Sequence, residues 1–194
     1  MASSSKARPW IPVAVVLALV ASGGGGCGEI DGSQTQYPGT VRYLSPGGGY
    51  HFHYLAPPWV LVASSGDVLD MIVPDSFTAI PRSTADVLYH LRIEPQAAAA
   101  LAAAVSRSQT LARDANAIVT AVRPVVVDGE LARTEVLWRE RSTDVLHRDA
   151  FLAGALPDES FRMSFSARVT LDDDPMISQM IASFGAEPAG GTRP

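Results

Sequence analysis

Two histidines separated by one residue, His51 and His53, are the side chains whose spacing best suits metal chemistry. Residues i and i+2 of a strand point to the same face, so the two imidazoles would stand side by side, as some zinc sites require. His90, on the polar face of another predicted strand, would complete a set of three imidazoles if the strands were neighbours. Strand alternation alone explains the spacing, because a solvated face carries polar residues. We therefore predict no metal, and keep these three histidines as the candidate ligands.

Motifs that would indicate an enzyme are missing, since the sequence contains no GxSxG, HExxH or GxxxxGK[ST]. Gly47, Gly48 and Gly49 are predicted to form a turn before a strand. The acidic run Asp172 to Asp174 lacks the spacing of an EF-hand, and an acidic helix N-terminus explains it better than a cation site. The chain is therefore predicted not to be an enzyme and to use no cofactor.

The first 26 residues read as a signal peptide. Lys6 and Arg8 precede the uncharged apolar run from Trp10 to Ala21, which is the order of a secretory signal. A membrane-spanning helix needs roughly 17 to 25 apolar residues, and this run is shorter. Export is the prediction.

Cys27, the one cysteine of the chain, lies just past this run, after the small residues Ser22 to Gly26. A cysteine in this place resembles the lipobox of bacterial lipoproteins, in which it is acylated and becomes the new N-terminus. Gly24 to Gly26 stand where lipoboxes usually carry leucine. The alternative is an ordinary signal peptide cut near Ala21 to Gly23, which would leave Cys27 as a free thiol. The resemblance implies a membrane partner through a lipid anchor on Cys27, on the periplasmic or surface side of the cell envelope.

Composition favours a single globular domain, with 47% hydrophobic residues among 194. Removal of residues 1–26 leaves 13 basic against 20 acidic residues, a net charge of −7. Nucleic acid is not an expected partner, because its binding requires clustered Lys and Arg. Residues 27–40 are predicted to form the lipidated cysteine and a flexible tether, 41–187 the domain, and 188–194 a disordered tail.

Alternating apolar residues predict several strands. The clearest runs from Phe161 to Val169, with every second residue apolar. Asp128-Gly129 between two apolar runs predicts a tight hairpin, and Pro124 predicts an edge or a bulge in its strand. The other predicted strands are 50–56, 68–73, 85–93, 117–127 and 145–152, with Trp59 and Trp138 in the core or at its rim.

Two helices are expected. The first begins at Pro95 and runs through the alanine-rich segment to Asp114. Its predicted buried stripe is Leu101, Val105, Ala112 and Ala115. The second has Asp174 as N-cap and Pro175 at its first position, and its buried residues are Ile177, Met180, Ile181 and Phe184.

The segment GYHFHYLAPPW, the order of strands and helices after it, and the closing ASFG resemble the PsbP-like family, named for an extrinsic subunit of photosystem II. The resemblance covers roughly residues 41–187. It implies an α+β fold, an antiparallel sheet flanked by helices in an α/β/α sandwich. It also implies an accessory or assembly role, because the family is largely non-catalytic.

The first functional hypothesis is therefore a lipid-anchored, non-enzymatic cell-envelope protein whose domain docks on a protein partner. The alternative is an envelope binding protein for a metal ion, held by His51, His53 and His90, or for a small apolar ligand beneath the long helix.

Overall fold

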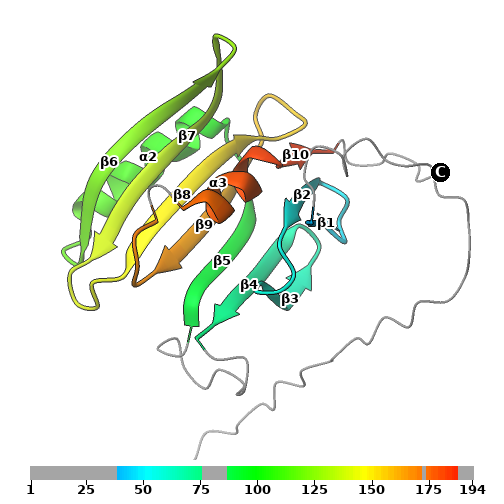
Figure 1. Ribbon diagram of the computed structural model, residues 1–194. Helices are drawn as coiled ribbons and strands as arrows, with labels where there is room; N and C mark the ends of the chain where they lie inside the picture. The colour runs from blue at the N-terminus through cyan, green and yellow to red at the C-terminus, as the bar shows by residue number, and fades with distance from the viewer. Residues whose placement is uncertain (1–38, 76–86, 172–173, 188–194) are drawn as a thin grey trace, which may run out of the picture. The chain divides into compact units, whose positions relative to one another are not determined.

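Antiparallel strands make up most of the part of the chain that the computed structural model describes, residues 39–75, 87–171 and 174–187 (Figure 1). All of these residues belong to one unit, Asp31–Pro194. The elements in chain order are β1 (Val41–Leu44), β2 (Tyr50–Tyr54), β3 (Val60–Ser65), β4 (Val68–Pro74), β5 (Val87–Gln96), α2 (Ala100–Arg113), β6 (Ala117–Val127), β7 (Glu130–Glu140), β8 (Leu146–Ala153), β9 (Ser160–Ala167), α3 (Pro175–Ala182) and β10 (Gly185–Ala186).

Seven strands form the large sheet in the order β3-β4-β5-β9-β8-β7-β6, with antiparallel pairing throughout. A small sheet has the order β1-β2-β10. The predicted α+β class with antiparallel pairing is confirmed. Strands dominate more than expected, since β1, β3 and β10 were not predicted and the described residues contain two helices.

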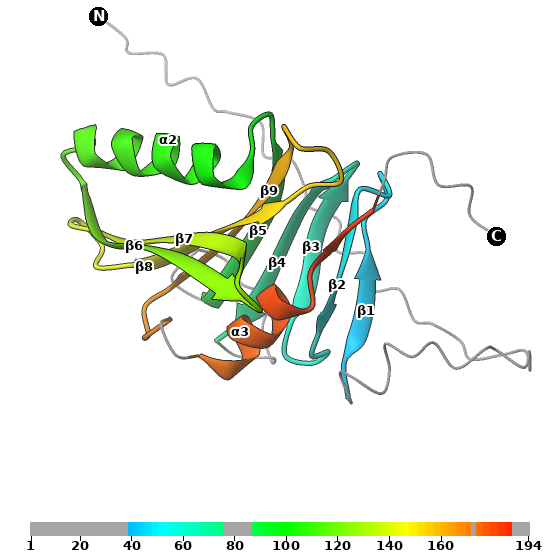
Figure 2. The same ribbon diagram turned by 90° about the horizontal axis from the view of Figure 1, so that it is seen from above.

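The helices lie on opposite faces of the large sheet (Figure 2). On one face, Ala103, Ala104 and Leu111 of α2 pack on β6, β7 and β8, where they contact Val136 and Phe151. On the other face, α3 and the small sheet share the main hydrophobic core. Its fully buried large side chains include Tyr50, Phe52, Leu91, Ile93, Met163, Phe165, Ile177, Met180 and Ile181.

The β6–β7 hairpin follows the sequence prediction closely. Asp128 and Gly129 have φ angles of 52° and 85°, which is the left-handed region that a two-residue hairpin turn requires. Pro124 lies in β6, an edge strand, as predicted. Its missing N–H is tolerated there because the outer side of an edge strand has no strand partner.

The long helix starts later than predicted. Pro95 lies inside β5, opposite Phe161 of β9, because the pairing of the two strands continues to Gln96. The helix begins at Ala100, and its N-cap Ala99 makes no side-chain cap hydrogen bond. The predicted stripe was also wrong: Leu101 and Val105 are exposed by 52% and 43%.

The residues of α2 that are buried are Ala103, Ala104 and Leu111, while Ala112 is exposed and Ala115 lies beyond the helix end. Small alanines face the sheet because they let the helix approach it closely, and the larger Leu101 and Val105 are left on the solvent side.

The predicted start of the short helix α3 is confirmed, but the helix ends at Ala182, before Phe184, and Gly185 begins β10. The Asp174 carboxylate accepts hydrogen bonds from the backbone N–H groups of Met176 and Ile177, at 2.9 and 3.2 Å, and Pro175 occupies the first turn. Phe184 follows the helix and stacks on Tyr50 of β2, with ring centroids 5.5 Å apart. The helix is thereby held against the small sheet.

The glycine triplet forms the predicted turn, and its sequence is explained by Asp67. A Cβ on Gly47 or Gly49 would lie 2.5 or 2.9 Å from the Asp67 side chain. The Asp67 carboxylate accepts hydrogen bonds from Ser45 Oγ at 2.7 Å and from the Gly49 N–H at 3.0 Å. This contact joins the β1–β2 connection to the β3–β4 turn.

Several predictions fall outside the described residues. These are the signal peptide 1–26, Cys27 and nearly all of the tether 27–40, Asp172 and Asp173, and the tail 188–194. Within the described residues, no helix is long and apolar enough to cross a membrane.

Candidate functional site

His53 of β2 does not lie on a solvated face as predicted, whereas the side chain of His51 is 25% exposed. Tyr50 and Phe52 fill the main core as expected, but His53 is only 3% exposed. Its Nδ1 lies 3.2 Å from Thr40 Oγ1, and its backbone N–H donates to Ser183 Oγ at 2.8 Å. Ser183, which follows α3, thus holds the backbone of β2 at His53, a long-range contact that strand alternation could not reveal.

His51 and His90 contact separate carboxylates. His51 Nδ1 lies 2.7 Å from Glu187 Oε1, while His90 Nε2 lies 3.3 Å from Asp70 Oδ1. His51 is in the small sheet, and His90 is in the large sheet between β4 and β9. Among the described residues, no group of three His, Cys, Asp or Glu side chains is placed to hold a metal ion. The structure therefore does not bring the three candidate ligands together.

A buried carboxylate beneath α2 gathers three donors from three elements. Asp149 is 0% exposed and accepts hydrogen bonds from Arg107 Nε at 3.0 Å, from Trp138 Nε1 at 3.1 Å and from Ser164 Oγ. Three donors satisfy a charge that would otherwise be costly to bury. This cluster fixes α2 on the sheet, which is a structural role.

Trp138 also stacks on His147, with centroids 3.7 Å apart and planes 4° from parallel. The Arg107 guanidinium lies over the Trp138 ring, 5.1 Å from the ring centre. Burial lowers the pKa of His147 below its ordinary value and outweighs the nearby carboxylates of Asp149 and Glu140, which act in the opposite direction. His147 is therefore held in its neutral form at neutral pH.

On the opposite face of the sheet, Arg148 and Glu135 form a second buried cluster. Arg148 donates to both carboxylate oxygens, from Nη2 at 3.0 Å and from Nε at 3.2 Å, and Arg133 Nε adds a third hydrogen bond at 2.7 Å. Arg148 Nη1 reaches the Leu171 carbonyl oxygen at 3.1 Å. Burial raises the pKa of Glu135, but the two guanidinium groups prevail, so the pKa lies below its ordinary value.

The first surface available to a partner is the edge strand β3. All six of its residues are exposed, and Val60, Leu61 and Val62 are exposed by 42%, 50% and 51%. Within the described part of the chain, β3 pairs only with β4, so its outer edge presents unpaired backbone groups. The sequence reasoning missed this strand because VLVASS does not alternate between apolar and polar residues.

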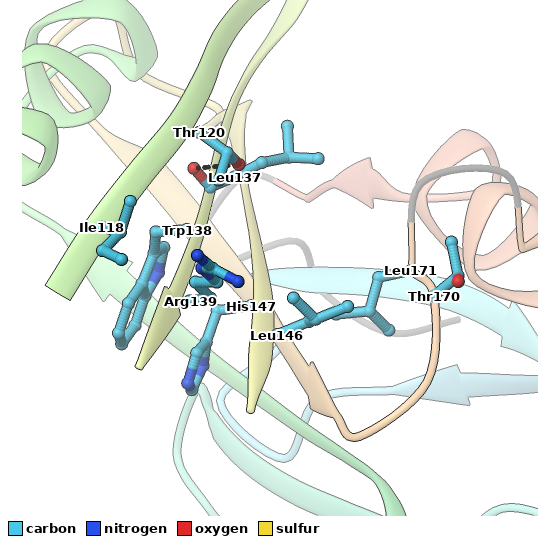
Figure 3. Close-up of a pocket in the computed structure, with 9 residues that line it drawn as sticks. All are labelled: Ile118, Thr120, Leu137, Trp138, Arg139, Leu146, His147, Thr170 and Leu171. Carbon is cyan, nitrogen blue, oxygen red and sulfur yellow. Dashed lines mark hydrogen bonds between the residues drawn. The ribbon is translucent and has the colours of Figure 1, made fainter. Parts of the chain in front are cut away.

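The second available surface is a hollow of about 340 Å³ (Figure 3). Its lining comes from β6, β7, β8 and the segment after β9: Ile118, Thr120, Leu137, Trp138, Arg139, Leu146, His147, Thr170 and Leu171. No sequence motif predicts this hollow, because its lining comes from four segments that are separate in the sequence.

Most of this lining faces the α3 side of the sheet. Ile118 lies opposite Arg139, and Arg139 opposite Leu146, and residues directly opposite each other share a face. Leu146 and Leu171 contact the main core and approach each other in Figure 3. Trp138 and His147 belong to the α2 side, where their rings stack.

No protein-family model matches this sequence, and no curated protein matches it. Similarity is found among solved structures. The match with a mutant of the protein Mog1 covers 76% of this chain and 96% of that protein, with 9% identity and a TM-score of 0.52. The match with the Saccharomyces cerevisiae Ran-binding protein Mog1p covers 75% of this chain and 94% of that protein, with 9% identity and a TM-score of 0.51. At this identity the likeness concerns the fold alone.

A Bacteroides thetaiotaomicron protein is also similar, with 16% identity and a TM-score of 0.45, over 79% of this chain. The chain spans half of the length of that protein.

Proposed function

We propose that the chain is a non-enzymatic protein of the cell envelope, exported by residues 1–26 and anchored by a lipid on Cys27, whose folded domain docks on a protein partner. The observation that carries the docking role is β3, an edge strand with three consecutive exposed apolar residues and no charged residue. Soluble proteins usually blunt such an edge with charge, proline or a cover.

The two edges of the large sheet differ in this respect. The opposite edge strand, β6, carries Arg123 and Pro124. Charge and proline discourage another chain from adding a strand. Irregular pairing does not separate the two edges, because it occurs twice between β6 and β7 and once between β3 and β4. β3 has neither proline nor charge, so an extended segment of a partner can pair with it through backbone hydrogen bonds while Val60, Leu61 and Val62 supply apolar contact.

The fold supports a docking role by analogy. The yeast neighbour Mog1p is named a Ran-binding protein, so a domain of this fold serves protein recognition elsewhere. We also propose that the domain is PsbP-like, an α/β/α sandwich. The presence of one helix on each face of the large sheet supports that assignment, as does the early strand whose aromatic residues fill the core.

The docking role is tested by site-specific photo-crosslinking in cells. A photoreactive residue in place of Leu61 should give one crosslinked product of defined mass in the envelope fraction. The matched control is Leu156, which is exposed by 59% but lies in the connection between β8 and β9. Equal crosslinking at both positions, or none at Leu61 in a folded and correctly located protein, would count against docking through β3.

The anchor is tested separately with Cys27→Ser. We expect the wild-type chain to sediment with membranes and its N-terminal peptide to carry an acylated cysteine by mass spectrometry, while the variant is released in soluble form. An unmodified Cys27 in the membrane fraction would contradict the lipid anchor.

A second candidate function is the binding of a small apolar ligand. The hollow favours it, because Ile118, Leu137, Leu146 and Leu171 give it apolar walls and its volume of about 340 Å³ lies at the lower end of the roughly 300–1,000 Å³ of ligand pockets. The site differs from the one expected, which was beneath the long helix. The test is saturable binding of a small apolar molecule that alters the fluorescence of Trp138.

A further inference from the structure

We infer that the hollow takes a small amphipathic anion, an apolar body with one carboxylate or phosphate group, and that Arg139 pairs with the anionic group. This inference rests on the second candidate function above, and it adds the chemical class of the ligand. Three observations carry it: the distribution of charge around the hollow, the accessibility of Arg139, and the position of Arg139 between two apolar side chains.

The charge of the hollow is opposite to that of the chain. The whole chain has a formal net charge of −5, yet none of the nine lining residues is acidic and one of them, Arg139, is a full positive charge. Arg148 adjoins the same wall, because its Nη1 donates to the carbonyl oxygen of Leu171, but its charge is balanced by Glu135. The positive charge of the hollow therefore comes from Arg139. A hollow of this sign attracts an anion and disfavours a cation.

Arg139 is available to exchange its partner. Its side chain is 49% exposed, and its ion pair with Asp144, at 3.5 Å, is made to a side chain that is 83% exposed. An exposed pair of this kind contributes little to stability. A ligand carboxylate that also buries an apolar body can therefore replace Asp144 at little cost. A guanidinium further offers two parallel N–H donors to a carboxylate or phosphate.

The register of the strands places this charge beside the apolar walls. Arg139 lies between Ile118 of β6 and Leu146 of β8 on the same face of the sheet. Leu137, two residues earlier on β7, extends the apolar surface along the strand, and Leu171 closes it from the segment after β9. An anionic group at Arg139 thus leaves its apolar body over Leu137, Leu146 and Leu171. The small volume restricts that body to a short chain or a single ring.

Four probes separate head group from body in a titration followed by Trp138 fluorescence and calorimetry: octanoate, octyl phosphate, 1-octanol and inorganic phosphate. The protein is the unit Asp31–Pro194, which contains both hydrophobic clusters. Octanoate and octyl phosphate should bind saturably. The affinity for 1-octanol should be about tenfold weaker, because it lacks the charge-assisted hydrogen bonds. Inorganic phosphate should not bind measurably.

The decisive variant is Arg139→Gln, with Arg141→Gln as the matched control. Both substitutions remove one positive charge from the same region, but Arg141 lies in the β7–β8 turn and does not line the hollow. Arg139→Gln should reduce the affinity for octanoate to that for 1-octanol and leave 1-octanol binding unchanged, while Arg141→Gln should behave as wild type. An unchanged melting temperature shows that the fold is retained.

The possible failures are distinguishable. If octanoate and 1-octanol bind equally, or if both variants act alike, the inference about Arg139 is overturned while the apolar-ligand function stands. If none of the amphipathic probes binds saturably, both fall. Binding of inorganic phosphate as tight as that of octyl phosphate would show that the apolar walls contribute nothing, and would also overturn the inference.

Discussion

Two ion pairs between an arginine and a carboxylate lie on opposite faces of the large sheet, and they differ above all in burial. Arg148 donates to Glu135 from two nitrogen atoms, while Arg92 reaches Asp70 through Nη1 alone. Arg148 and Glu135 are 3.0 Å apart with side chains exposed by 4% and 2%. Arg92 and Asp70 are 3.1 Å apart with side chains exposed by 45% and 22%. The first pair is covered by α3 and the segment before it, while the second lies on the part of the sheet beyond α2 (Figure 2).

This difference in burial separates the charges that stabilise the fold from those that contribute little to its stability. Charges removed from water are stabilised only by each other, so loss of one partner leaves the other uncompensated. Charges that remain in water are screened, and their pairs contribute little. Glu135 and Arg148 therefore specify how β7, β8 and α3 fit together. The exposed charges of β4 and β5 form a solvated surface that is free to change.

The largest effect is expected from Glu135→Gln. The substitution removes the negative charge that pairs with Arg148 and Arg133 and one of the two acceptor oxygens, and loss of one partner from a buried pair costs about 3–5 kcal/mol. We expect a reduced free energy of unfolding in urea at neutral pH. The control is the double variant Glu135→Met with Arg148→Met, which removes both charges and should lose less than the single one. A single variant as stable as wild type would break the contrast between the two faces.

Glu135 should also make the stability of the fold depend on pH in the acidic range. Because the pKa of Glu135 is lowered in the folded state, its stabilising contribution is present above its ordinary pKa and is lost as the pH falls through the lower folded value. Stability measured during acidification should therefore fall less steeply in Glu135→Gln than in the wild type.

A smaller effect on the pH dependence of stability is expected from His147, which lies on the α2 side of the sheet. Its pKa is lowered in the folded state by burial, so the unfolded chain binds the proton more readily. Its contribution is complete above the ordinary value of 6.5 and is lost as the pH falls below it. Between pH 7 and 5, His147→Gln should show a flatter stability profile than the wild type. An identical slope in the two proteins would mean that the stacked imidazole is protonated freely.

The fold was predictable where local patterns agree with the tertiary structure. Alternation along β9, the Asp128-Gly129 turn and the capped start of α3 each depend on neighbours in sequence, and each appears as expected. Pro95 misled because a proline suits both a helix start and a strand end. Here the pairing of β5 with β9 continues past it.

The candidate site was less predictable, for physical reasons. The His51-x-His53 spacing reports only that two residues share a face of β2. It does not show that His53 is buried, or that its backbone N–H pairs with Ser183, more than a hundred residues later. The hollow draws its lining from strands that the sequence separates, so only the register brings Ile118, Arg139 and Leu146 together. The β3 edge was hidden because an exposed strand has no buried face to impose alternation.

The smallest effect is expected from Asp70→Asn. This carboxylate contacts both Arg92 and His90, yet all three side chains are partly or largely exposed. Since water and salt screen such a pair, the free energy of unfolding should change by about 0–1 kcal/mol and the change should shrink further at 1 M salt. The comparison with Glu135→Gln is then direct, because each substitution replaces one carboxylate by its amide next to an arginine. If Asp70→Asn cost as much as Glu135→Gln, burial would not be what separates the two clusters. The charges of β4 and β5 would then be needed for the stability of the fold.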